Sequence, residues 1–324
     1  MHKQLAYKHL SFSFLLIVLL LLQSIDTSGQ QWRRNRNQVF VGLGASGFMG
    51  DLGGANDPGG LWLRDFDFAA VRPAMTFGYR YMLNRNFGIS ANLAFGLISG
   101  NDRHTLEEYR NNRNIHFRSP LIEVGANAQF HFWEIRHRPA RRGPVGRGRR
   151  LQIMDFTFYG FTGVGGVYFN PQGYFDREAY TGSIPVDQLP ENGWYSLRRL
   201  NTEGQGFFPT RQSYSPVTLF IPVGLGVMIR PNPDFSIGVE YGLRTTFTDY
   251  IDDVSTTYVD PQIFSQMFDD PSMIARAEFF ANPTRNSLDP IVTAPGQQRG
   301  NPFSNDSYMF TFIKQIGRAS CREI

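Results

Sequence analysis

A glycine-rich motif near the start of the chain has the spacing of a nucleotide-binding loop. The segment Gly42-Leu43-Gly44-Ala45-Ser46-Gly47 matches the pattern G-x-G-x-x-G and follows a short apolar stretch. A nucleotide-binding loop needs a helix to begin at this point, because the helix N-terminus holds the pyrophosphate. The chain instead continues from Phe48 to Gly54 with three further glycines, which does not favour a helix. We therefore interpret Gly42 and Gly44 as small, inward-facing residues of a strand.

The histidines could serve as metal ligands or as catalytic bases, but their spacing supports neither role. His104, His116, His131 and His137 show no H-E-x-x-H pattern and no cysteine–histidine spacing. The sequence also has no G-x-S-x-G motif of the kind that presents a nucleophilic serine. We predict no catalytic residue, no metal site, no cofactor and no enzyme activity.

Clustered carboxylates form a third candidate. Asp249, Asp252 and Asp253 lie close together, and such clusters can bind calcium. Their spacing is not that of an EF-hand loop, so we expect a solvated acidic loop that faces lipopolysaccharide. Whether residues 249–253 bind an ion stays open at this point.

The remaining chemistry-bearing residues are charged side chains inside otherwise apolar segments. Apolar residues alternate with small or polar ones over about 10 positions, which is typical of strands with one face toward lipid and one toward a lumen. Four segments show this alternation clearly and four show it weakly. The clear segments are 87–97, 122–132, 217–229 and 235–243. The weak segments are 39–46, 71–81, 156–168 and 308–313. The pattern predicts an all-β fold: an eight-stranded antiparallel transmembrane outer-membrane β-barrel.

The connections between these segments alternate in length. Short turns lie at 84–86 and 231–234, whereas the other side has long loops, the longest of them before and after the strands at 217–243. Short periplasmic turns and long extracellular loops are typical of outer-membrane barrels. A soluble, lipocalin-like barrel is the alternative, but it has no reason to place apolar residues outward.

Seven polar side chains should point into the lumen of this barrel. Eight strands leave an interior that side chains can fill. We therefore expect an ion-paired polar plug in place of a channel. These residues are Arg72, Arg80, Glu123, Gln129, His131, Glu240 and Arg244.

The two ends of the chain have special features. Lys3 and Lys8 precede an apolar run from Phe12 to Leu22, which predicts a secretory signal peptide over 1–29 and export to the outer membrane. The run is too short for a spanning helix. Residues 316–324, which contain the single cysteine, resemble a translated adapter. We therefore expect a barrel domain over 30–315 with a shortened last strand, and a non-native tail after it.

One periplasmic turn is unusually long and basic. It carries most of the excess positive charge, so the net charge of +4 does not favour nucleic acid. Either the turn is solvated and touches lipid headgroups, or it is a docking site for an acidic periplasmic partner. Its arginines are Arg136, Arg138, Arg141, Arg142, Arg147, Arg149 and Arg150.

Three segments resemble the PorG-like family, the outer-membrane barrel component of the type IX secretion system. They are Gly50-Asp51-Leu52-Gly53-Gly54, the stretch from Asp249 to Ser255, and Gln298-Arg299-Gly300-Asn301-Pro302. The resemblance implies a non-enzymatic anchor for the periplasmic ring of the secretion and gliding machinery. Its partners would be the ring protein and its lipoprotein, besides outer-membrane lipid and lipopolysaccharide. The alternative is a stand-alone small barrel, similar to OmpX or OmpA, for adhesion or envelope stability.

Overall fold

The structure is a computed structural model that describes residues 36–50, 52, 70–104, 108–135, 155–231, 235–284 and 291–319. The predicted signal peptide, the arginine-rich turn at 136–150 and Cys321 lie outside these residues. Within them, no helix is long and apolar enough to cross a membrane.

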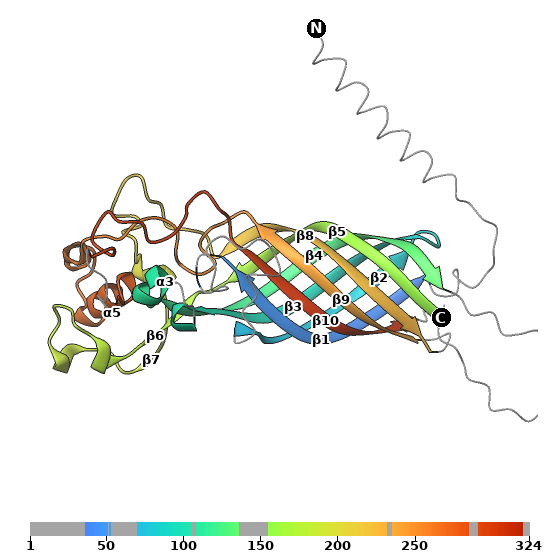
Figure 1. Cartoon of the computed structure of the whole chain (residues 1–324), viewed down its shortest axis with the longest axis horizontal. Helices are drawn as coiled ribbons and strands as arrows, with labels where there is room; N and C mark the ends of the chain where they lie inside the picture. Colours follow the sequence, from blue (N-terminus) through green and yellow to red (C-terminus); the bar gives the residue numbers. More distant parts are fainter. Residues whose placement is uncertain are drawn as a thin grey trace, which may run out of the picture. The chain divides into compact units, whose positions relative to one another are not determined.

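Eight antiparallel strands close into a barrel. Their order is β3-β2-β1-β10-β9-β8-β5-β4, and β3 pairs with β4 to complete the ring. Figure 1 shows these strands running side by side, tilted along the barrel. The predicted fold class and all eight predicted strands are confirmed. The strands are β1 (Asn37–Met49), β2 (Arg72–Met82), β3 (Phe87–Asn101), β4 (His116–Ile135), β5 (Asp155–Phe169), β8 (Val217–Arg230), β9 (Phe235–Thr246) and β10 (Ser307–Arg318).

The two faces of the barrel wall differ in polarity. Outward side chains such as Leu43, Val124 and Leu225 are apolar and largely exposed, Leu43 to 66%. Their neighbours on the inward face are buried, and Glu123 is only 1% exposed. A continuous apolar belt of this kind faces lipid, because a protein surrounded by water rarely exposes so large an apolar patch. The chain is therefore a transmembrane barrel of the outer-membrane class.

The glycine motif at 42–47 lies entirely within β1. A Cβ atom on Gly44 would lie 1.9 Å from the main-chain oxygen of Thr311 on the neighbouring strand. Glycine at this position therefore lets two strands approach closely, which agrees with the interpretation of these glycines as strand residues.

The closing strand is longer than expected. β10 pairs with β1 through Arg318, which lies opposite Gln38, and Ile316 packs inside the lumen against Phe40 and Met228. The alternation that buries Lys314 continues to Ile316, so residues 316–318 take part in the strand, and the shortening of the native strand stays a prediction. The barrel extends past the predicted boundary at 315, whereas the non-native origin of residues 316–324 stays a prediction.

The pairing of β4 with β5 contains one register shift. The register shifts between His131 and Trp133 of β4, opposite Tyr159 and Phe158 of β5. The aromatic and glycine pattern of 158–166 indicated a bulge in the fifth strand. The bulge is instead in the partner strand, at the same level of the barrel.

The long connections fold into a second packed region, the extracellular cap, formed by the described residues of 102–115, 170–216 and 247–306. Figure 1 shows its helices and the β6–β7 hairpin gathered beyond one end of the barrel. Phe175, Phe264 and Phe280 are part of its core. Its elements are η3 (Asp102–His104), α3 (Glu108–Arg113), β6 (Gln172–Phe175), η4 (Arg177–Ala179), η5 (Val186–Gln188), β7 (Gly193–Ser196), η6 (Arg198–Leu200), η7 (Pro261–Ile263), α4 (Phe264–Met267) and α5 (Pro271–Ala281).

Candidate functional site

Glu123 of β4 is the centre of one polar cluster in the lumen. Arg244 of β9 donates from Nε to Oε2 of Glu123 at 3.1 Å, and the Tyr308 hydroxyl of β10 donates to the same oxygen at 3.1 Å. Asn92 of β3 donates to the other carboxylate oxygen at 3.1 Å. In the ring of eight strands, β4 and β10 are four strands apart in either direction. The contact between Glu123 and Tyr308 therefore crosses the full width of the barrel.

A second cluster is formed by Glu240 of β9 and Lys314 of β10. Lys314 Nζ donates to Oε1 of Glu240, and the Tyr159 hydroxyl of β5 donates to Oε2 at 2.8 Å. The Lys314 ammonium also lies over the Phe40 ring, 4.6 Å from its centroid. Both carboxylate oxygens of this buried glutamate are thus paired, as a charge in a low-dielectric interior requires.

Arg80 of β2 completes the filling of the lumen. It is 0% exposed, and its Nη1 lies 3.1 Å from the sulfur of Met228 on β8, again four strands away. Its guanidinium lies 5.2 Å from the Tyr159 ring centroid and 6.0 Å from that of Phe40, within the range of cation–π attraction. Two contacts therefore cross the whole barrel, one by Tyr308 and one by Arg80, which agrees with a lumen filled by side chains.

Six of the seven predicted lumen residues lie inside the barrel, and Arg72 lies at its extracellular end. Glu123, Glu240 and Arg244 take part in the two carboxylate clusters, beside which Arg80 is buried. Gln129 donates to Ser90 at 3.0 Å, and the His131 ring lies 5.3 Å from that of Tyr159. Arg72 lies instead at the extracellular end of β2, where its Nη1 donates to the Val71 oxygen.

Four residues of the two carboxylate clusters were missing from the predicted set: Asn92, Tyr159, Tyr308 and Lys314. All but Tyr159 could have been found from the alternation alone. Continuing the inward positions of the last strand from Tyr308 through Phe310 and Phe312 places Lys314 in the lumen. Tyr159 was hidden, because the strand around it has adjacent aromatic residues that blur the alternation.

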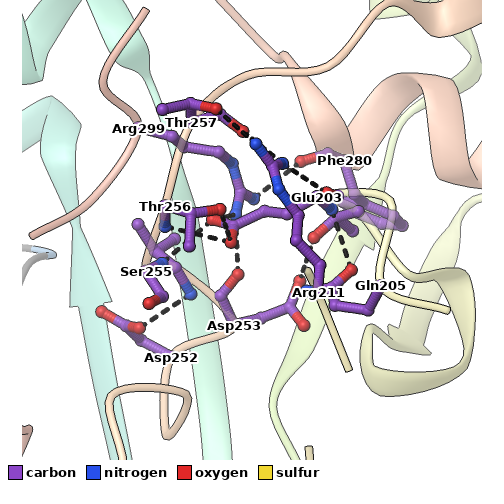
Figure 2. A network of polar contacts seen from close by, with 12 residues as sticks. Glu203, Gln205, Arg211, Asp252, Asp253, Ser255, Thr256, Thr257, Phe280 and Arg299 are labelled. Carbon is purple, nitrogen blue, oxygen red and sulfur yellow. Dashed lines mark hydrogen bonds and ion pairs between the residues drawn. The ribbon is translucent and has the colours of Figure 1, made fainter. Parts of the chain in front are cut away.

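A buried polar network holds the extracellular cap together (Figure 2). Arg299 donates from Nη1 to Glu203 Oε1 at 2.8 Å and to the Asp253 main-chain oxygen at 2.7 Å. Glu203 accepts main-chain hydrogen bonds from Ser255 at 2.9 Å and Thr256 at 3.0 Å. This network ties the loop after β5 to the loop after β9, so the two longest loops form one structural unit.

Asp253 lies at the centre of the same network. Thr202 and Tyr214 donate from their hydroxyls to its two carboxylate oxygens, at 2.6 and 2.5 Å. Burial raises the pKa of Asp253 to about 6, although the nearby Arg299 guanidinium opposes the shift. The Asp253 carboxyl therefore keeps its proton to a higher pH than an exposed aspartate does.

The acidic segment at 249–253 is not the solvated loop that the sequence indicated. Asp249, Asp252 and Asp253 are all buried, as are Ile251 and Val254 beside them. The apolar neighbours fill the base of the cap and carry the aspartates inward. Among the described residues, no group of three or more His, Cys, Asp or Glu is arranged to hold a metal ion.

The fold and the filled lumen together define a small, closed outer-membrane β-barrel. No protein-family model matches the chain, and no curated protein matches its sequence. Solved structures of similar architecture include Ail of Yersinia pestis, crystallised with the heparin analogue sucrose octasulfate. It is 11% identical, over 87% of this chain and 95% of Ail, with a TM-score of 0.32.

Two further barrels are similar at the same level. Neisserial surface protein A is 7% identical, over 87% of this chain and 97% of its own, with a TM-score of 0.36. OprG of Pseudomonas aeruginosa is 12% identical, over 88% of this chain and 96% of its own, with a TM-score of 0.31. Similarity this low carries no argument about function, and the fold assignment rests on the strand pairing described above.

Proposed function

We propose that this chain is a non-enzymatic barrel that anchors the periplasmic ring of the type IX secretion and gliding machinery in the outer membrane. The observation that carries the proposal is the filled lumen, in which Tyr308 and Arg80 make contacts across the whole barrel. A lumen filled in this way leaves no open path for exported cargo. The barrel would therefore support export without conducting it.

The cap supports the same conclusion from the other side of the membrane. It packs a core of its own and ties its two long loops together through Arg299 and Glu203. With the lumen filled, partners can reach the protein at its lipid-facing wall, at its periplasmic face and at the outer surface of the cap. We propose that the periplasmic face meets the ring protein and its lipoprotein, and that lipid and lipopolysaccharide surround the wall and the cap.

The resemblance to the PorG-like family involves residues of this cap. Asp252, Asp253, Ser255 and Arg299 come from two of the three resembling segments, and all four belong to the network of Figure 2. The resemblance thus concerns side chains whose packing builds the cap. It supports a shared architecture, and from that the secretion role is proposed.

Deleting the gene tests this role. We expect loss of secreted proteins that carry C-terminal sorting domains, with an intact envelope, and full rescue by the wild-type chain. Normal secretion together with a fragile envelope would instead favour the stand-alone barrel. The two outcomes are separated by assaying secreted cargo and detergent sensitivity in the same strain.

Docking to the ring can be tested at the arginine-rich segment, which lies outside the described residues. Replacing the seven arginines between Arg136 and Arg150 by serine should reduce co-purification of the ring, because an acidic partner loses its counter-charges. Replacing the same residues by lysine keeps the charge and is the matched control. Equal recovery of the ring with the serine variant would count against docking at this segment.

A further inference from the structure

A basic and aromatic surface, the rim patch, lies where the barrel wall continues into the extracellular cap. It is formed by Arg118 of β4, Gln172 and Tyr174 of β6, and Trp194 of β7. Arg118 pairs with Gln172 across β4 and β6, and Tyr174 pairs with Trp194 across β6 and β7. Side chains paired across strands share one face of a sheet, so all four side chains lie on the same face.

The rim patch lies on the outward face, beyond the apolar belt. Arg118 has the same place in the alternation of β4 as the exposed residues Ile122 and Val124. A strand rises about 3.3 Å per residue and is tilted by about 40°, so Arg118 lies roughly 10 Å beyond Ile122 along the barrel axis. Tyr168, which is exposed and pairs with Ile122, marks the interfacial edge of the belt. The rim patch is therefore level with the headgroups of the outer leaflet.

Arg118 is held in place without a counter-charge. Its Nε donates to Gln172 Oε1 at 2.9 Å, and its guanidinium carbon lies 4.1 Å from the centroid of the Trp194 ring. Contact with a ring uses the flat face of a guanidinium, so the N–H groups at its edge stay available. Among the described residues, Nη1 and Nη2 of Arg118 make no hydrogen bond, and no carboxylate pairs with this arginine. The rim patch thus presents a fixed positive charge with free donors.

The charges near the rim patch do not cancel that of Arg118. His116 packs edge to face on Trp194 at 6.1 Å, and Asp102 and Arg103 of η3 act on it electrostatically. Asp102 is 0% exposed and is paired within the cap. Arg103 is exposed and forms no ion pair with any described residue. The exposed charge of this described group is therefore positive, which favours an anionic partner.

Trp194 and Tyr174 add an aromatic surface and two more donors. Their rings meet edge to face at 5.6 Å, and the side chains are 40% and 37% exposed. Neither Trp194 Nε1 nor the Tyr174 hydroxyl has a hydrogen-bond partner within the described part of the chain. Such side chains, with an apolar body and a polar tip, are enriched at membrane–water interfaces. A hydrocarbon chain alone would leave these donors and the Arg118 charge unpaired.

From these observations we propose that the rim patch binds a phosphate group of outer-leaflet lipopolysaccharide. The Nη donors of Arg118 take the phosphate oxygens, and Trp194 and Tyr174 lie against the adjoining sugar and donate to its oxygens. The rim patch continues the lipid-facing wall, so its occupant is a molecule whose acyl chains lie along that wall. The inference rests on the part of the proposed function that surrounds the wall and the cap with lipopolysaccharide, and it does not depend on the secretion role.

Native mass spectrometry of the full chain in detergent tests this inference. The probes are lipopolysaccharide, the same lipopolysaccharide after removal of its phosphates, and phosphatidylglycerol. We expect wild-type protein to retain lipopolysaccharide in a saturable way. The dephosphorylated probe should bind at least tenfold more weakly, because Arg118 loses its partner, and phosphatidylglycerol should not displace lipopolysaccharide at equal concentration.

Variants of the rim patch make the test specific. Arg118→Gln should bind lipopolysaccharide at least tenfold more weakly and should show no further loss with the dephosphorylated probe. Arg118→Lys keeps the charge without the fork of donors and should lie between the two. Trp194→Ala should weaken binding severalfold. The matched control is Arg199→Gln, which removes an exposed arginine of η6 that has no ion pair among the described residues, and it should bind like wild type.

Four results would overturn the inference. They are no saturable retention, equal retention by wild type and Arg118→Gln, an equal loss with Arg199→Gln, and displacement by phosphatidylglycerol at equal concentration. Protease resistance of the cap in each variant shows that a lost signal does not reflect a lost fold. Because binding is measured on purified protein, its failure is distinct from failure of the secretion role, which the gene deletion tests.

Discussion

The lumen and the extracellular cap both bury ion pairs, but they assemble them in opposite ways. In the lumen, Arg244 and Tyr308 lie directly opposite each other on neighbouring strands, so the register of the sheet brings them to Glu123. In the cap, Arg299 meets Glu203 across 96 positions of the chain, and neither residue lies in a helix or strand. Regular strands thus place charges by periodicity, whereas the cap places them only through its complete fold.

The two networks also stabilise different kinds of structure. The lumen clusters join strands that are already held by continuous main-chain pairing. The cap network instead joins irregular loops, which have few such hydrogen bonds to hold them. We therefore expect damage in the lumen to be spread over the barrel, and damage in the cap to stay local.

The largest effect should come from Arg299→Met. The substitution leaves the buried Glu203 carboxylate without its cation, which costs about 3–5 kcal/mol. We expect the cap to become protease-sensitive while the β-sheet circular dichroism of the barrel is retained. The double variant Arg299→Met with Glu203→Gln should recover part of the loss, and loss of both regions together would contradict the separation of cap and barrel.

Tyr308→Phe should destabilise the barrel and leave the cap unchanged. It removes a hydrogen bond to a charged group in the lumen and should lower the free energy of unfolding of the barrel by about 1.5–3 kcal/mol. Urea titration in lipid measures this loss, and the protease resistance of the cap should stay unchanged. Tyr168→Phe, on the lipid-facing side, is the matched control and should be nearly neutral.

The pH dependence of the cap should follow Asp253. Its pKa is raised by burial to about 6, so the folded cap binds the proton more tightly than the unfolded chain. Stability is therefore greatest below the unfolded pKa near 4 and falls as pH rises through about 6. We expect ~1–3 kcal/mol less protection from hydrogen exchange at pH 7 than at pH 4.

Asp253→Asn should flatten this pH profile. Asparagine also tolerates the left-handed backbone of this residue, which has a φ of 68°. An unchanged slope in the variant would assign the pH dependence to another group. Barrel unfolding, followed in the same samples, should not show the slope of the cap.

The smallest effect should come from a partly exposed ion pair on the barrel. Arg85 of the turn between β2 and β3 lies 3.1 Å from Glu134, and the side chains are 35% and 19% exposed. Arg85→Gln should change the free energy of unfolding by about 0.2–1 kcal/mol, because water screens such a pair. Urea titration at low and high salt checks it, and a loss as large as that of Tyr308→Phe would contradict the role assigned to burial.

The filled lumen itself can be tested by conductance. Wild-type protein in planar bilayers should show no stable large conductance, because Tyr308 and Arg80 make contacts across the barrel. A stable large conductance would contradict both the filled lumen and the anchoring role proposed from it.

The sequence by itself determined the barrel. Alternation gave the eight strands, their inward and outward faces, and three of the four ionised residues of the two lumen clusters. This worked because a strand repeats every two residues, so burial on one face appears directly in the order of the residues. Where the alternation was blurred by adjacent aromatic residues, as around Tyr159, the prediction missed a lumen residue and put the bulge in the wrong strand.

Only the tertiary structure decided the cap. The segment around Asp253 was expected to be solvated, yet it is buried, because Glu203 and Arg299 come from distant parts of the chain to surround it. A pocket of the cap, lined by Tyr109 and Arg113 of α3 and by residues 297–301, likewise forms only when α3 meets this later segment. Loops have no repeating geometry to mark which residues turn inward, so their contacts follow from the whole fold and cannot be read from local patterns.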